Sequence, residues 1–288
     1  MLREEITGAS AATFAGSTDI PERYLQSDEI GIVVDVESCK PFLPVIDMAR
    51  LLDESQEETA KLGSACRDWG FFQKKAVGTI KADGGFQGFG HHFNTSTVTC
   101  RRDVLDKYSL EMSKLTSLLM ASMAADLGVK RETLLETIQG KLQNMIFHHY
   151  PPCHHGADKV VGIAPHTDNF CLTALLQLDT TPGLQISKDG KWFPVQPLPG
   201  SFTIFVGDIL EVLTNGRYKS VEHRVLVHPE RGRTTVVAFQ DACVTGVVKP
   251  LPELGEDARY KSIEKYDYTQ GQLHAIEERG RFIDSLRI

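Results

Sequence analysis

The chain has few of the features that mark membrane, secreted or organelle-targeted proteins. No apolar run approaches the ~18 residues that a membrane-spanning helix needs. The first twenty residues carry Glu4, Glu5 and Asp19 and contain no apolar segment, unlike a secretory signal or an acid-poor transit peptide. We therefore expect a protein that acts without a membrane.

Paired cysteines and excess positive charge are also absent. The six cysteines are scattered and form no C-x-x-C pair, which disfavours a disulfide framework and predicts reduced thiols in a cytoplasmic protein. Lys and Arg number 31 against 38 Asp and Glu, a formal net charge of −7. Because nucleic-acid binding depends on clustered Lys and Arg, we expect no nucleic-acid partner. We expect instead a small-molecule ligand, and we expect the protein to be a monomer.

Helical patterns dominate the chain before residue 140. Ser55 and Glu58 form an S-x-x-E capping box, which predicts a helix that runs toward Trp69. Apolar residues at 104, 108, 112, 115, 119 and 123 are three or four positions apart, as in a long amphipathic helix. We expect a shorter helix over 131–138, ended by Gly140, and short strands at 43–47 and 71–72.

Short apolar runs separated by turn signals follow from about residue 145. Asp189-Gly190 and Asn215-Gly216 predict hairpins, because both dipeptides tolerate the positive φ angles of a type I′ turn. Many short strands at this spacing favour a barrel or a jelly roll. We therefore divide the chain into a helix-rich region, residues 1–140, and a β domain, residues 141–288, that ends in a helical tail. The expected strands are 163–166, 171–178, 184–187, 192–195, 202–206, 223–227 and 234–239.

The most informative pattern consists of two histidines and an aspartate. His166 and Asp168 are two residues apart, and His223 follows 223 − 168 = 55 residues later. Side chains two apart on a strand point to the same face. Two imidazoles and one carboxylate leave three positions of an iron ion open, which suits the binding of a cosubstrate and O₂. A lone His-x-Asp pair is more often structural, so the hypothesis depends on His223 and on the residues that follow it.

A charged residue in an apolar run supports a ligand site. Arg233 precedes a run of Val, Ala and Phe, where an unpaired charge is costly. Arg233 could form an internal salt bridge, or it could bind a carboxylate of a dicarboxylic acid, whose two oxygens match the guanidinium. We favour the ligand because the His-Asp-His pattern lies near in sequence. The hydroxyls of Thr235 and Tyr150 could complete the hydrogen bonds of that carboxylate.

These residues belong to a series of motifs whose order and spacing cover about residues 140–245. The series resembles the plant-type 2-oxoglutarate- and Fe(II)-dependent dioxygenases, the family related to isopenicillin N synthase. The motifs are Tyr150-Pro151-Pro152-Cys153, Pro165-His166-Thr167-Asp168, Pro182-Gly183-Leu184-Gln185, residues 215–225 (NGRYKSVEHRV) and Arg233-x-Thr235.

The resemblance implies a fold, a reaction and a set of site residues. The fold would be mainly β with flanking helices, around a double-stranded β-helix of the cupin-like jelly-roll type. The enzyme would oxidise a small organic metabolite, a plant hormone or a specialised metabolite, while 2-oxoglutarate and O₂ are converted to succinate and CO₂ with ascorbate as reductant. The implied roles are Fe(II) binding for His166, Asp168 and His223, 2-oxoglutarate binding for Arg233, Thr235 and Tyr150, and substrate binding for Phe239.

The chain also departs from the family pattern. His148 stands where the family commonly has Asn, and Thr235 where it commonly has Ser. Relatives usually have a further strand and helix before the segment that corresponds to residues 87–90, but here Phe71-Phe72-Gln73 runs directly into Lys74. A second segment is missing between Phe93 and Arg101, so we expect a shortened N-terminal region. Two alternatives stay open: an oxidase of the same family that uses ascorbate or the substrate as electron donor, and a catalytically silent short isoform that acts as a binding or regulatory protein.

Overall fold

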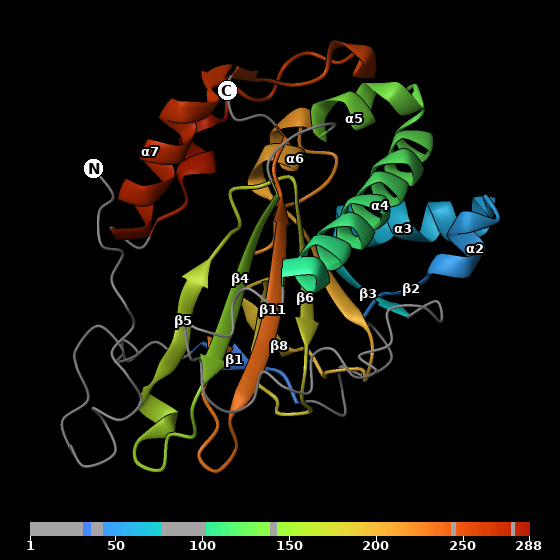
Figure 1. Cartoon of the computed structure of the whole chain (residues 1–288). Helices are drawn as coiled ribbons and strands as arrows, with labels where there is room; N and C mark the ends of the chain where they lie inside the picture. The colour runs from blue at the N-terminus through green and yellow to red at the C-terminus, as the bar shows by residue number, and fades with distance from the viewer. Residues whose placement is uncertain (1–30, 36–42, 76–101, 139–142, 243–245, 278–279) are drawn as a thin grey trace.

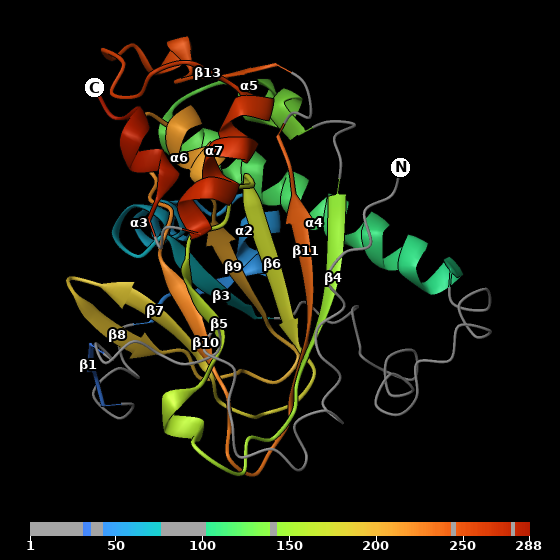
Figure 2. The same cartoon turned by 90° about the vertical axis from the view of Figure 1, so that its left-hand side faces the viewer.

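Two facing β-sheets form the centre of the structure, with helices on the outside (Figures 1 and 2). The structure is a computed structural model and describes residues 31–35, 43–75, 102–138, 143–242, 246–277 and 280–288. The larger sheet has the order β2 (Val45–Asp47), β3 (Phe71–Lys75), β9 (Phe202–Val206), β6 (Leu172–Gln177), β11 (Arg233–Gln240), β4 (Gln143–Tyr150). The smaller sheet has the order β1 (Ile32–Val33), β8 (Lys191–Pro194), β7 (Leu184–Lys188), β10 (His223–Leu226), β5 (Val161–His166).

The chain passes back and forth between these sheets. Strands β4, β6, β9 and β11 belong to the larger sheet, and β5, β7, β8 and β10 belong to the smaller one. All pairings within these two sets of four strands are antiparallel. This is the double-stranded β-helix, or jelly roll, that the sequence predicted. Strands β2 and β3 extend the larger sheet at its edge, and β1 pairs with β8 in the smaller sheet.

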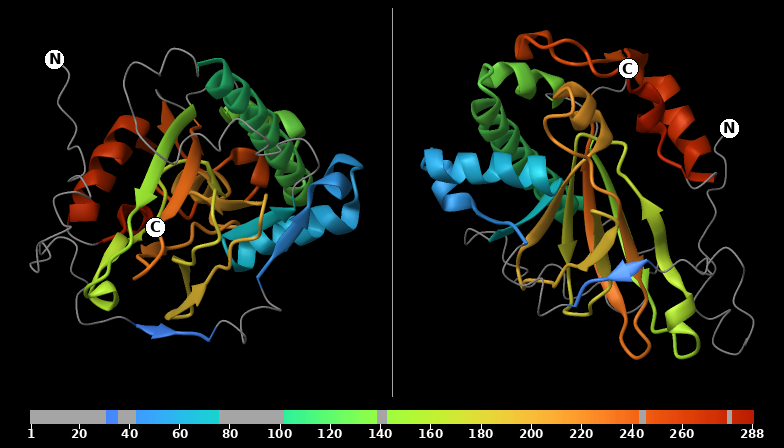
Figure 3. Two further views of the ribbon diagram at one scale, coloured as in Figure 1. Left: turned by 60° about the horizontal axis from the view of Figure 1, so that its bottom comes forward. Right: turned by 180° about the vertical axis from the view of Figure 1, so that it is seen from behind.

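The two central strands β6 and β9 of the larger sheet are covered on both faces, so they are nearly continuous apolar runs. Alternate side chains point into the jelly roll or outward: Phe71 and Phe205 belong to the inner cluster, Phe72 and Ile204 to the outer one. Every residue of β9 is buried. The outer face packs against a layer of helices (Figure 3), which comprises α2 (Met48–Leu52), α3 (Gln56–Asp68), α4 (Arg102–Leu127) and α5 (Arg131–Ile138).

The remaining elements lie around one end of the jelly roll (Figure 1) or in its connections. They are α6 (Asp208–Leu213), the small pair β12 (Val247–Val248) and β13 (Ile263–Glu264), α7 (Lys265–Glu277), and 3-10 helices η5 (Ala157–Lys159), η6 (Pro252–Leu254) and η7 (Phe282–Leu286). Within the described ranges, no helix has the length and apolar character needed to cross a membrane.

Most expected strands and helices are present, with small differences at their ends. The Asp189-Gly190 hairpin joins β7 to β8, and both residues have positive φ, 50° and 72°. The hairpin predicted at Asn215-Gly216 is wrong. Both residues have positive φ, 52° and 75°, but they form a turn after helix α6 and do not join two strands.

Two further sequence predictions are only partly met or lie outside the described residues. Ser55 caps α3 by accepting from the Glu58 amide at 3.4 Å, but Glu58 Oε1 accepts from the Asp47 amide at 2.8 Å and does not return to Ser55, so the capping box is half formed. Gly140 and residues 76–101, where the chain was expected to be shortened, lie outside the described residues. The division at residue 140 stays a prediction.

Helix α4 offers a direct test of the outer core, since it carries one buried and one exposed leucine. Leu119 is fully buried and Leu110 is 57% exposed. Leu119→Ala should lower the free energy of unfolding by ~2–5 kcal/mol, because it removes buried methyl groups and leaves a cavity. Leu110→Ala should change it by less than ~0.5 kcal/mol. Urea unfolding followed by circular dichroism measures both; equal losses would show that α4 does not pack as described.

Candidate metal centre

His166, Asp168 and His223 converge at the ends of two neighbouring strands. His166 ends β5 and pairs directly with His223, the first residue of β10, while Asp168 follows β5 by two residues. Asp168 Oδ1 lies 3.8 Å from His166 Nε2 and 3.9 Å from His223 Nε2. One ligand atom from each residue lies within 4.8 Å of the others, and among the described residues no other such group of His, Cys, Asp or Glu meets these limits.

Backbone carbonyls set the orientation of both imidazoles. His166 Nδ1 lies 2.8 Å from the Ala164 carbonyl oxygen, and His223 Nδ1 lies 3.2 Å from that of Val221. A carbonyl only accepts hydrogen bonds, so each Nδ1 donates a proton to it and each Nε2 is turned toward Asp168. The Phe205 ring stacks on His223 with centroids 4.4 Å apart.

Burial keeps His223 in the neutral form that a metal ion requires. Desolvation and then the neighbouring His166 lower the pKa of His223 to about 4. Asp168 Oδ2 is buried and has no hydrogen-bond partner among the described residues. Two imidazole nitrogens and a carboxylate with an unpaired oxygen form the donor set that non-haem Fe(II) sites use, so these residues fit a ferrous ion.

A buried arginine lies in the same jelly roll. Arg233 is 2% exposed, and its guanidinium carbon lies 5.4 Å from the centre of the Tyr150 ring, which is its partner across β11 and β4. Arg233 Nε donates to the Gln177 side-chain oxygen at 3.1 Å. In the described part of the chain, neither terminal nitrogen of Arg233 has a hydrogen-bond partner, and nor does the Thr235 hydroxyl. The internal salt bridge considered from the sequence is therefore not formed there.

These orphaned donors fit an anionic ligand. An unpaired buried cation is strongly unfavourable, so the arrangement is suited to a carboxylate that accepts from both terminal nitrogens. Burial lowers the pKa of Arg233. The ordinary pKa of a guanidinium is so far above the physiological range that the group nevertheless stays charged. Burial raises the pKa of Tyr150 to about 12, so its hydroxyl keeps the proton and can donate.

Two glycines make room around this group, a role that the sequence did not reveal. A Cβ on Gly183 would lie 2.6 Å from the Leu226 carbonyl oxygen and 3.3 Å from Arg233 Cδ. A Cβ on Gly162 would lie 2.7 Å from the Tyr150 ring. Any larger residue at either position would displace the backbone or the side chains that surround the guanidinium, which explains why these strands carry glycine.

Phe239 and His148 lie on strands that also contribute to the arginine group. Phe239 lies on the same face of β11 as Arg233 and Thr235, because side chains two or four positions apart on a strand point the same way. The centre of its ring lies 4.7 Å from that of Phe170, which follows Asp168 by two residues. His148 pairs with Thr235 across β4 and β11. Burial, the charge of Arg233 and the nearby His166 lower the pKa of His148. The sequence singled out Phe239 and His148, but it did not indicate Phe170 or Gln177.

Comparison with known proteins agrees with this geometry. Residues 141–242 match the 2OG-Fe(II) oxygenase superfamily, and residues 43–82 match the family described as non-haem dioxygenase in morphine synthesis N-terminal. Protein SRG1 of Arabidopsis thaliana is 32% identical over 333 residues, which cover 94% of this chain and 93% of SRG1. The 2-oxoglutarate-dependent dioxygenase 11 of Oryza sativa subsp. japonica is 31% identical over 86% of each chain.

A solved structure shows the same fold. The crystal structure of JOX2 in complex with 2OG, Fe and JA has a TM-score of 0.79 and 23% sequence identity, and the match covers 96% of each chain. Together with the His166, Asp168 and His223 triad, these similarities establish that the chain belongs to the 2OG-Fe(II) oxygenase superfamily and is a 2-oxoglutarate- and Fe(II)-dependent dioxygenase of the plant type.

Proposed function

We propose that the protein hydroxylates or otherwise oxidises a small organic metabolite, a plant hormone or a specialised metabolite, and releases succinate and CO₂. The observation that carries this proposal is the unpaired edge of Arg233, buried in the same jelly roll as the triad. Fe(II), when bound, supplies the redox chemistry that couples 2-oxoglutarate and O₂ to oxidation of a C–H bond. The protein's own groups bind, orient and exclude water.

The proposed roles follow from the contacts of each side chain. His166, Asp168 and His223 would hold the ferrous ion, with both imidazoles preset by backbone carbonyls. Arg233 would bind the distal carboxylate of 2-oxoglutarate through its two terminal nitrogens. The Thr235 and Tyr150 hydroxyls would donate further hydrogen bonds to that carboxylate.

Phe239 is the residue that we propose contacts the substrate. Its ring and that of Phe170 lie 4.7 Å apart, and Phe170 is close in sequence to the proposed iron ligand Asp168. Two aromatic rings would exclude water and would favour a substrate with an apolar or aromatic portion. The net charge of −7 suits a small metabolite better than a polyanion.

Three further expectations extend this proposal. We expect ascorbate as the reductant, a monomer, and a cytoplasmic location. The described cysteines Cys66, Cys153 and Cys171 are free thiols, in keeping with a reducing compartment. The unpaired edge of Arg233 matches the two oxygens of a carboxylate, which 2-oxoglutarate carries at its distal end and ascorbate lacks, so we favour 2-oxoglutarate over an oxidase that draws its electrons from ascorbate alone.

A silent short isoform is the second candidate. The alignment with SRG1 extends over 333 residues, more than the 288 of this chain, so SRG1 has segments that this chain lacks. Against this candidate, the described residues include the whole triad and the arginine group.

Turnover separates the enzyme from the silent isoform. The purified protein with Fe(II), 2-oxoglutarate, O₂ and ascorbate should form succinate when a panel of plant hormones, phenolic compounds and alkaloids is added. Mass spectrometry should detect an oxidised product in equal amount. A cooperatively folded, iron-loaded protein that forms no succinate above the background of free iron with any compound would favour the silent isoform.

His223→Ala should abolish iron retention, because two remaining protein ligands form a weak site. We expect Fe(II) affinity to fall by more than the ~100-fold that loss of an outer hydrogen-bond partner of a ligand can cost. Anaerobic loading, desalting and metal analysis measure the retained iron. His154→Ala, which removes an exposed histidine, should retain one equivalent as the unchanged protein does; equal retention in both variants would rule out His223 as a ligand.

Arg233→Ala should leave iron binding intact and weaken 2-oxoglutarate binding. Loss of hydrogen bonds from a charged donor to a carboxylate costs ~1.5–3 kcal/mol each, so the Kd for 2-oxoglutarate should rise by ~100-fold or more. Calorimetry with Mn(II)-loaded protein measures this Kd without turnover. If the Kd were unchanged, the cosubstrate carboxylate would have to bind elsewhere.

A further inference from the structure

The Gln177 side chain accepts a hydrogen bond from one of the three donor nitrogens of Arg233. Gln177 ends β6 and pairs with Thr235 across β6 and β11. Its side-chain oxygen accepts from Arg233 Nε at 3.1 Å, while Nη1 and Nη2 have no acceptor among the described residues. An arginine can bind a carboxylate through Nε and one terminal nitrogen, or through both terminal nitrogens. Gln177 leaves only the second edge available.

The orientation of the Gln177 amide is set by its other partners. Its nitrogen donates to the Thr181 carbonyl oxygen at 2.6 Å and to Asp179 Oδ1 at 3.1 Å. Both partners only accept hydrogen bonds, so the amide nitrogen faces them and the oxygen must face Arg233. Asp179 is itself held by the amides of Thr181 at 2.9 Å and Thr234 at 2.5 Å.

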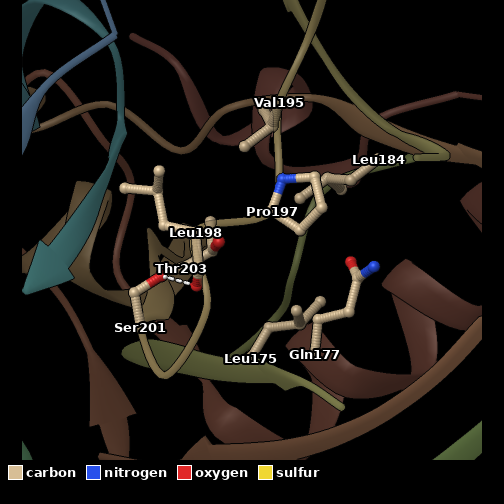
Figure 4. A pocket seen from close by; sticks show the side chains of 8 residues that line it. All are labelled: Leu175, Gln177, Leu184, Val195, Pro197, Leu198, Ser201 and Thr203. Atoms are coloured by element: carbon tan, nitrogen blue, oxygen red, sulfur yellow. Dashed lines mark hydrogen bonds between the residues drawn. The ribbon is translucent and has the colours of Figure 1, made fainter. Parts of the chain in front are cut away.

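Gln177 also lines a small cavity with mostly apolar side chains. The cavity has a volume of about 10 Å³, which is the space of about one water molecule (Figure 4). Its lining residues are Leu175, Gln177, Leu184, Val195, Pro197, Leu198, Ser201 and Thr203.

We infer that Gln177 is a positioning residue: by holding Nε, it makes Arg233 present both terminal nitrogens to the distal carboxylate of the cosubstrate. This inference rests on the proposed function. A neutral amide fixes the guanidinium without neutralising it, whereas a carboxylate in the same place would pair with the arginine and compete with the ligand.

The chain contains a second pair of the same chemistry that serves as a control. Gln185 accepts from Arg224 Nε at 2.8 Å, and the Arg224 guanidinium carbon lies 4.0 Å from the centre of the Trp192 ring. Arg224 and Gln185 are partners across β10 and β7, directly next to the His223 and Ile186 pair. Because strand side chains alternate, Arg224 and Gln185 point away from the metal centre.

The test is to replace each glutamine with methionine, which keeps side-chain length and removes the acceptor. Calorimetry with Mn(II)-loaded protein should measure the affinity for 2-oxoglutarate and for 2-oxopentanoate, which has a methyl group in place of the distal carboxylate. Gln177→Met should weaken 2-oxoglutarate binding by ~10-fold or more, since the guanidinium loses its fixed orientation. It should leave Mn(II) and 2-oxopentanoate binding unchanged, and in turnover it should raise KM for 2-oxoglutarate more than it lowers kcat. Gln185→Met should change none of these quantities.

Several outcomes would overturn the inference. The inference is wrong if Gln177→Met binds 2-oxoglutarate as tightly as the unchanged protein does. It is also wrong if the variant binds 2-oxoglutarate and 2-oxopentanoate with equally reduced affinity, because loss of a merely structural residue would weaken the binding of both compounds. If Gln177→Met does not melt cooperatively, Gln177→Asn replaces it: the shorter amide draws its oxygen away from Nε, and the same selective loss is expected. If the unchanged protein binds Mn(II) but not 2-oxoglutarate, the proposed function fails, and this inference fails with it.

Discussion

The antiparallel pairing of β10 with β5 is the constraint on which the site depends. It places His223 opposite His166, although 57 residues separate them (223 − 166 = 57). A shift of one residue in this register would turn the histidine to the other face of the sheet and would bring Arg224 inward. The next strand reinforces the register, since His223 also pairs with Ile186 on β7. Strand pairing thus brings the two histidines together, and the connection that follows β5 adds Asp168.

The same alternation separates two cores with different tasks. Inward side chains of the jelly roll, such as Phe71 and Phe205, surround the site, while outward ones, such as Phe72 and Ile204, pack against the helices. The inner core contains groups that reduce stability, because each buried polar atom without a partner costs ~1–3 kcal/mol. The outer core is larger and apolar, so it offsets this cost. The β2 and β3 strands of the N-terminal region complete the sheet that separates the two cores.

Much of this arrangement could be predicted from the sequence because the patterns involved are local. Apolar runs bounded by turn residues gave the strands, and His-x-Asp gave two of the three converging side chains. Helix α6 could not be predicted, because six residues are too few to show a helical period and its polar residues Asp208 and Glu211 are buried with the others. Strand β4 carries intermediate and exposed side chains in a mixed order, so it shows no clear alternation. Gln177 is an ordinary strand residue in sequence, and only its register with Thr235 brings it to Arg233.

Arg233 and the triad represent two solutions to the same electrostatic problem. In the triad, a buried carboxylate lies beside two imidazoles, and burial lowers the pKa of His223, so a bound cation would complete the balance. Around Arg233, the adjacent groups Gln177, Thr235 and Tyr150 are neutral and the Asp179 carboxylate lies behind Gln177, so an anion at the two terminal nitrogens would complete the balance. Each site alone leaves a buried charge, so binding of the partner should stabilise the native fold further. Fe(II) held by the triad would supply the positive charge there, and a carboxylate held by Arg233 would supply the negative one, so a dianionic cosubstrate that binds both the ion and Arg233 would couple the occupancy of the two sites.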